Sequence, residues 1–238
     1  MLLALQLICW AVGLPLMLMV IAALLRGGYR LFPVLFIYQI LDFLMTVASL
    51  PPYIAYYFYH DPGARTRMAR WFWWDELLLQ PLVYAVVISL IYRATEKAPA
   101  RGLVRGVLIG GAALIAGASF LYHFHPGLHG DWMAFWTRDL TFSSAILDLA
   151  LWALLLSFRI KDTRLLLVSG GLGIQFTGEA IGESLRSMAV QHRSRPLSFT
   201  GSLIIALVDL LSVYIIWQAF RNTTRAKTQK EPPFDGRL

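Results

Sequence analysis

The chain has 238 residues, of which 58% are hydrophobic and only 15% are charged. Because a soluble domain carries nearer a quarter of charged residues, this composition excludes a soluble globular protein. The formal net charge of +7 needs no nucleic-acid partner, since its excess lies in short loops between apolar segments, as membrane insertion requires. Cys9 is the only cysteine, so the chain has no disulfide framework and no cysteine-based zinc motif.

Seven segments are long and apolar enough to cross a membrane as helices, which takes roughly 20 residues each. We expect spans at 3–25, 31–59, 71–92, 103–123, 135–158, 163–188 and 198–220. Together they predict an all-α fold with one domain, residues 1–220, which is a polytopic bundle of seven transmembrane helices. Residues 221–238 are polar and include two adjacent prolines, so we expect a disordered cytoplasmic tail.

The spans differ in their small and helix-bending residues. Pro51 and Pro52 in the second span and Pro81 in the third predict kinks. The sixth span holds several glycines, and in the fourth span glycine recurs at every fourth position, as Gly102, Gly106 and Gly110. Small residues at this spacing let helix backbones approach closely, so both spans are expected to pack tightly.

Basic residues divide unequally between the two sides of the predicted bundle. Fourteen of the 21 Lys and Arg, including all four lysines, fall on the side of the first-to-second, third-to-fourth and fifth-to-sixth loops and the tail. Because cytoplasmic loops are enriched in Lys and Arg, this predicts the N-terminus outside and the C-terminus in the cytoplasm. No basic residue precedes the first span, which favours an uncleaved helix over a signal peptide.

Carboxylates lie deep within several of the predicted spans. At a rise of 1.5 Å per residue, these are Asp42, Asp148 and Asp209, near the middle of a ~30 Å apolar core, and Glu179, in its outer half. A charge at that depth is costly, and such acids usually face the bundle interior and mark ligand or ion sites. Since no lysine falls within a span, they cannot all stay ionised cheaply, and we expect some to be protonated or to hold a cation.

Helix geometry groups further polar residues with these acids. Gln175, Glu179 and Glu183 are spaced by four, so they share one face of the sixth helix. The leading hypothesis is a protein that binds or transports a small molecule or ion, or senses it, through an outward-facing acidic intramembrane cavity. The residues expected to line that cavity or its entrance are Asp42, Asp75, Glu76, Asp148, Gln175, Glu179, Glu183 and Asp209.

One predicted outer loop is rich in histidine. Its candidate metal ligands are His123, His125, His129 and Asp131, because imidazole and carboxylate together suit Zn²⁺. Solvated loop histidines are the alternative, since the spacing matches no established metal motif. The metal interpretation would make the chain a metal-dependent membrane hydrolase. A third hypothesis is a structural subunit of a membrane complex, in which the buried acids only form hydrogen bonds between helices. Whether the chain is an enzyme therefore stays open.

Two stretches carry a family resemblance: Phe32-Pro33 through Tyr59, and Trp73-Trp74-Asp75-Glu76 after it. They resemble small uncharacterised seven-helix bacterial integral membrane proteins. The resemblance implies no activity, but it fits a location in the bacterial inner (plasma) membrane. The expected partners are the lipid bilayer, a small molecule or cation and, for a receptor role, a cytoplasmic protein.

Overall fold

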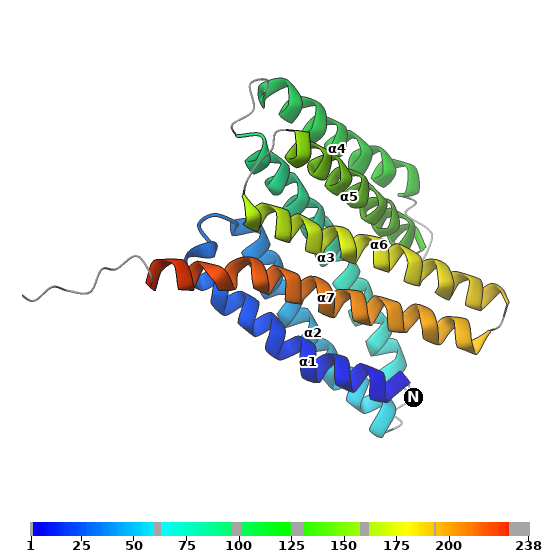
Figure 1. Cartoon of the computed structure of the whole chain (residues 1–238). Helices are drawn as coiled ribbons and strands as arrows, with labels where there is room; N and C mark the ends of the chain where they lie inside the picture. Colours follow the sequence, from blue (N-terminus) through cyan, green and yellow to red (C-terminus); the bar gives the residue numbers. More distant parts are fainter. Residues whose placement is uncertain are drawn as a thin grey trace, which may run out of the picture.

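The chain folds into long helices that pack side by side (Figure 1). The computed structural model describes residues 2–59, 63–96, 101–124, 131–157, 162–192 and 194–228, and all regular structure in these ranges is helical. The elements are α1 (Leu2–Ala23), the π-helical turn η1 (Leu24–Gly28), α2 (Pro33–Phe58), α3 (Ala64–Ala94), α4 (Arg101–His123), α5 (Asp131–Ser157), α6 (Thr163–Gln191) and α7 (Arg195–Thr228).

Over the described ranges, seven helices are long and apolar enough to cross a membrane. The predicted all-α fold with seven such helices is therefore confirmed. A helix satisfies its own backbone hydrogen bonds, which is what the apolar interior of a bilayer demands. The class of protein that these helices indicate is an integral, multi-pass membrane protein.

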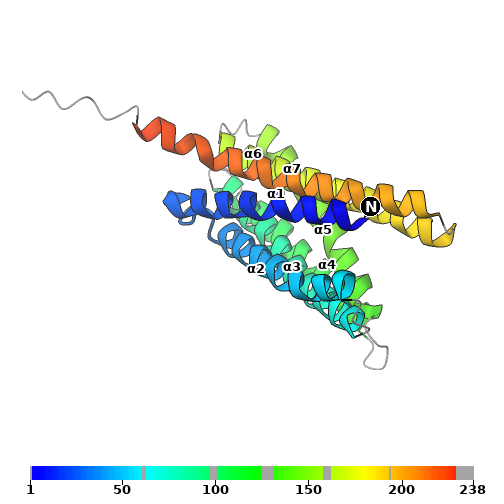
Figure 2. The same ribbon diagram turned by 90° about the horizontal axis from the view of Figure 1, so that it is seen from below.

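Successive helices alternate in direction, so the start of α1 and the end of α7 lie at opposite ends of the bundle (Figures 1 and 2). We call the end that holds the start of α1 and the α2–α3, α4–α5 and α6–α7 connections the N-terminal end, and the other the C-terminal end. Helix α1 packs against α7 and α2, and α3 packs against α2 and α5. Helix α4 lies at the edge of the bundle, mainly against α5.

A glycine shapes the turn between α1 and α2. Gly27, within η1, has a φ of 125°, a conformation that residues with side chains rarely adopt. Beside it, the Tyr29 N–H donates to the Leu24 carbonyl at 2.8 Å and closes the turn. Pro33 then opens α2 at a position where the missing N–H of proline costs nothing. The chain thus reverses direction within a few residues.

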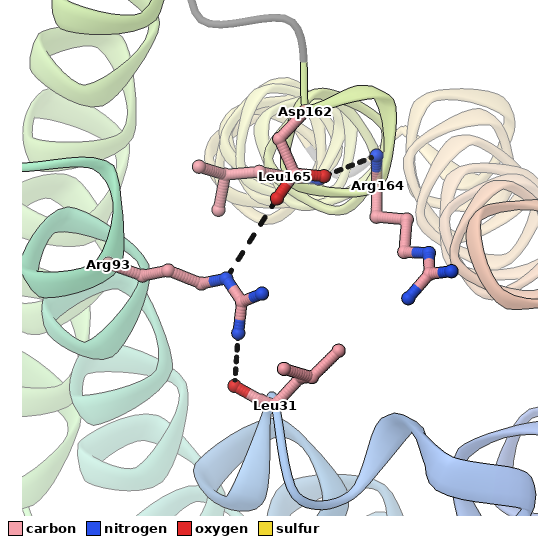
Figure 3. Close-up of polar contacts among 5 residues, drawn as sticks. All are labelled: Leu31, Arg93, Asp162, Arg164 and Leu165. Carbon is pink, nitrogen blue, oxygen red and sulfur yellow. Dashed lines mark hydrogen bonds and ion pairs between the residues drawn. The ribbon is translucent and has the colours of Figure 1, made fainter. Parts of the chain in front are cut away.

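Arg93, near the end of α3, joins three segments at the C-terminal end (Figure 3). Its Nη1 donates to the Leu31 carbonyl at 2.7 Å, and its guanidinium lies 4.3 Å from the centre of the Phe32 ring. Its Nε is 4.0 Å from the carboxylate of Asp162, which precedes α6. The other carboxylate oxygen of Asp162 accepts the backbone N–H of Arg164 at 3.1 Å, so the same residue also caps α6.

Buried apolar side chains fill the half of the bundle next to this junction. The fully buried ones include Val20, Leu24, Leu35, Leu90, Leu155, Leu165 and Ile216. They come from α1, η1, α2, α3, α5, α6 and α7, and α4 adds Ala112, so every helix contributes to one continuous core. Lipid tails are as apolar as these side chains, so the core stabilises the bundle mainly through dispersion contacts and shape.

Glycine lets α6 and α7 pack at close range. A Cβ atom on Gly178 would collide with Val208. One on Gly182 would collide with Ile205 and would lie 2.8 Å from the Gly201 carbonyl oxygen. The tight packing predicted for the sixth span is therefore confirmed.

The glycines of α4 have the same spacing but no neighbour. A Cβ atom on Gly102, Gly106 or Gly110 would meet no atom within 4 Å. The tight packing predicted for the fourth span is therefore wrong within the described chain. The reason is the place of α4 at the edge of the bundle, which leaves this face of the helix without a partner.

Candidate functional site

Three of the deep carboxylates interact with one another across three helices. Asp42 comes from α2, Glu179 from α6 and Asp209 from α7. The carboxylate of Asp42 lies within direct electrostatic range of Glu179, and Asp209 lies within that range of both. We call these three side chains the acid centre. Its position follows from the close approach of α6 to α7 at their glycines.

Helix α3 adds two further acids toward the N-terminal end. Glu76 interacts electrostatically with Glu179, Asp75 and Glu183, and Asp75 interacts with Asp42. Glu183 accepts a hydrogen bond of 2.7 Å from Arg186 Nη1, and the side chains of both residues are well exposed. The acids therefore form a continuous series from the exposed surface at Glu183 to the interior at Asp42.

Amide and hydroxyl groups surround the acid centre. Gln175 Nε2 donates to Glu179 at 3.0 Å, and Ser212 Oγ donates to Gln175 Oε1 at 3.3 Å. The Tyr38 hydroxyl also contacts the Gln175 side chain. These contacts orient Glu179 and link α2, α6 and α7 through one glutamine.

Two buried acceptor oxygens at the acid centre have no donor. Gln39 is 1% exposed, and its Nε2 points at Asp42 Oδ2, 3.5 Å away, but its Oε1 has no hydrogen-bond partner. Oδ1 of Asp209 is buried and unpartnered too. An unsatisfied buried polar group costs about 1–3 kcal/mol, and more when it is charged. Both oxygens are acceptors, so a bound cation, an added proton or a donor such as an ordered water would satisfy them.

Positive charge near these acids is confined to the exposed end. Within the described residues, Arg186 is the basic side chain that interacts with the acids, through Glu183 and Glu76. The four lysines, at positions 97, 161, 227 and 230, all lie outside the acid-bearing stretches of the chain. The acid centre therefore has no resident cation of its own among the described side chains.

Asp148 lies apart from the acid centre. It is 2% exposed and accepts a hydrogen bond of 2.7 Å from Ser169 Oγ, between α5 and α6. A Cβ atom on Gly173 would lie 2.7 Å from its Oδ2, so glycine makes room for the carboxylate. Gly173 and the α7-facing Gly171 are two positions apart, which places them about 200° apart around α6. The structure thus separates this predicted site residue from the others.

The predicted metal ligands fall only partly within the described chain. His123 Nε2 lies 3.1 Å from Asp139 Oδ2, which also accepts a 2.7 Å bond from Ser119. His125 and His129 lie outside the described residues, as does the side chain of Asp131. Among the residues that are described, no three His, Cys, Asp or Glu side chains are placed to hold a metal ion. The zinc site stays a prediction.

Several residues at these sites were missed from the sequence, although some carried a usable signal. Arg186 is three positions from Glu183, which is ion-pair spacing on a helix. Ser169 and Asp139 gave no such signal, because their partners are on other helices.

An apolar groove of about 380 Å³ lies between α4 and α5, away from the acids, and is lined by Leu103 and Leu154 among others.

No protein-family model, no curated protein and no solved structure matches the chain.

Proposed function

We propose that this protein binds a small cation, either an inorganic ion or a small protonated solute, at the acid centre, and that it acts as a transporter or as the membrane part of a receptor. The observation that carries the proposal is the pair of buried, unpartnered acceptors, Gln39 Oε1 and Asp209 Oδ1, beside three mutually interacting carboxylates. A positive ligand would relieve both the repulsion and the missing hydrogen bonds.

The distribution of basic residues supports access from outside the cell. Fourteen of the 21 Lys and Arg belong to the side of the C-terminal end, which the positive-inside rule assigns to the cytoplasm. The N-terminal end, where Glu183 and Arg186 are exposed, would then face outward. With the resemblance to seven-helix bacterial proteins, we place the protein in a bacterial plasma membrane, with its cation site open to the exterior.

The test is ligand-dependent stability of the purified protein in detergent, with sodium chloride and methylammonium chloride as probes at constant ionic strength. A probe that binds the folded state stabilises it by about 2.7 kcal/mol when present at a hundredfold excess over its Kd. We expect Asp42→Asn and Asp209→Asn to abolish this gain. Asp148→Asn is the control, because Asp148 is also a buried intramembrane acid but lies outside the acid centre, and it should keep the gain.

Two results would reject the proposal. One is that neither probe stabilises the wild-type protein, although the protein is folded. The other is that Asp42→Asn and Asp209→Asn lower stability but leave the gain from the probe unchanged. The second result would identify these acids as hydrogen-bonding groups that hold helices together, which is the role expected of them in a structural subunit.

A further inference from the structure

We propose that the series of acids from Glu183 to Asp42 is a proton pathway that opens at the N-terminal end and stops at the acid centre, so that protons and the bound cation exchange at the same carboxylates. This inference rests on the proposed function, since it names the ion that leaves when the cation arrives. It is carried by the order of the acids, by the unpartnered acceptors at their inner end and by the apolar core beyond them.

The outer part of the pathway is a set of neighbouring carboxylates of decreasing exposure. The Glu183 side chain is 61% exposed and meets water directly. Glu76 interacts with Glu183 and with Glu179, and Glu179 interacts with Asp209. Chains of acids within a membrane protein are a recognised means of moving protons. Glu179 and Glu183 lie one turn apart on α6, and Glu76 on α3 interacts electrostatically with both, so water molecules between the carboxylates would complete the steps.

The inner end is suited to receive a proton. A carboxylate only accepts hydrogen bonds, whereas a protonated carboxyl group also donates one. A proton on Asp42 or Asp209 would therefore supply the donor that Gln39 Oε1 and Asp209 Oδ1 lack. No three acidic, histidine or cysteine side chains among the described residues are placed to hold a multivalent metal ion, so the cation that exchanges with the proton is a monovalent one. A proton needs only one carboxylate.

The transfers balance without any redox partner. Hydronium at the N-terminal end gives its proton to Glu183 and leaves as water. Each following step breaks one O–H bond on the donor carboxyl and forms one on the next carboxylate, through Glu76 and Glu179 to Asp209 or Asp42. When a cation binds at the acid centre, the proton returns to water by the same route. Binding of one monovalent cation then releases up to one proton.

Beyond the acid centre, each of the four contributing helices carries a buried apolar side chain. One to three turns further toward the C-terminal end stand Leu35 on α2, Val83 on α3, Leu172 on α6 and Ile216 on α7, all buried. None of these four can carry a proton, and the buried acid further toward the C-terminal end, Asp148 with its partner Ser169, lies on the opposite side of α6 from α7 and is not in line with the acid centre. The pathway therefore exchanges protons with one side and does not conduct them across.

Other groups face the acids and share their titration. Cys9 on α1 interacts with Asp209, and Tyr38 on α2 interacts with all three residues of the acid centre. Tyr53, also on α2, interacts with Arg186 at the outer end. Asp75 on α3 interacts with Asp42. Because the protonation of these groups is linked, the experiment below follows the carboxyl groups specifically.

The test is time-resolved infrared spectroscopy of the purified protein after a jump to lower pH, which follows the carbonyl band of protonated carboxyl groups. We expect the double variant Asp42→Asn/Asp209→Asn to lose a large part of the band. Glu76→Gln with Glu183→Gln should keep the acid-centre amplitude but slow its appearance by roughly a hundredfold, the usual contribution of a positioned proton-transfer group. The single variant Glu183→Gln changes an exposed position, so it should fold normally. It should slow the appearance of the band by a smaller factor.

Asp148→Asn is again the control, and it should leave the rate of the remaining band unchanged. The pathway is wrong if the rate is indifferent to both glutamine substitutions, or if the band does not depend on Asp42 and Asp209. A pH dye in weakly buffered solution separates this inference from the proposed function. Methylammonium or sodium that stabilises the protein without releasing protons overturns the pathway and leaves the binding function standing. Normal band kinetics with no stabilising probe overturn the binding function, and with it the exchange of protons for a cation, but leave the route of the protons standing.

Discussion

The packing of α6 on α7 predicts that alanine at Gly182 is harmful although alanine is the better helix former. A Cβ atom on Gly182 would lie 2.8 Å from the Gly201 carbonyl oxygen, whereas ordinary contact begins at 3.4 Å. The obstacle is backbone, so it cannot turn away as a side chain could. The two helices must separate by roughly half an ångström, a gap that already forfeits about a quarter of the contact energy of each atom pair it affects.

The magnitude follows from two opposing effects. Overpacking of this kind costs about 1–3 kcal/mol, and the backbone obstacle places Gly182→Ala near the upper end of that range. Replacing glycine by alanine within a helix returns roughly 1 kcal/mol. We therefore expect Gly182→Ala to lower the free energy of unfolding by about 2 kcal/mol.

The matched control is Gly110→Ala on α4, where the added methyl group meets no atom within 4 Å. It keeps the helix-propensity gain without the collision, so it should raise the free energy of unfolding by up to about 1 kcal/mol. Equilibrium unfolding in mixed micelles, followed by circular dichroism, measures both variants. If the two substitutions change stability in the same direction and by similar amounts, the close approach of α6 and α7 is not what the glycine serves.

Three further substitutions test polar contacts of single side chains. Asp162→Ala removes the cap of α6 and should cost about 1 kcal/mol in the same unfolding assay, with earlier hydrogen exchange in the first turn of α6; unchanged exchange there would contradict the capping role. Tyr84→Phe removes the 2.7 Å bond from the Tyr84 hydroxyl to the Ala112 carbonyl oxygen and should cost about 1 kcal/mol, with proteolysis becoming faster in α4 if that helix is the one released. Ser169→Ala removes the hydrogen-bond donor from buried Asp148 and should cost about 1–3 kcal/mol of stability. If the additional change Asp148→Leu restores stability, the unpaired acid is the cause of the loss. If stability is not restored, the unpaired acid is not the cause.

The sequence located the helices well but their ends poorly, and the cause is physical. The third predicted span starts at residue 71, whereas α3 begins at Ala64. Hydropathy misses this start because it detects the apolar part of a helix and not its backbone hydrogen bonds, and the first turns of α3 include Arg65, Arg67 and Arg70. For the same reason α7 continues to Thr228, past the predicted span end at residue 220.

The face of a single helix was predictable, but the identity of its neighbours was not. The spacing of Gln175, Glu179 and Glu183 follows from the helical period and is a local property. Which acids meet depends on which helices touch, and two equally deep acids have different outcomes for that reason. Asp209 lies on α7 and joins Glu179, whereas Asp148 lies on α5 and meets the other side of α6 at Ser169.

The glycines also show that a local sequence pattern does not identify the neighbouring helix. Their four-residue spacing is alike in α4 and α6, so the sequence assigned both helices the same packing. Of these two helices, α6 packs closely at its glycines, against α7, whereas α4 does not. A spacing motif states how near a partner could come, and it carries no information on whether a partner is there.

The contact between α1 and α7 brings together two helices that are far apart in the sequence (Figure 2). During synthesis, α1 enters the membrane long before its neighbour exists, so much of its interior-facing surface must wait in lipid or against the insertion machinery. The carboxylate of Asp209 arrives only with α7, when most of the chain is already in place. The contacts of α7 with both α1 and α6 therefore form late, and a ribosome stalled before α7 would leave α1 to α6 without them, an intermediate for membrane quality control to recognise.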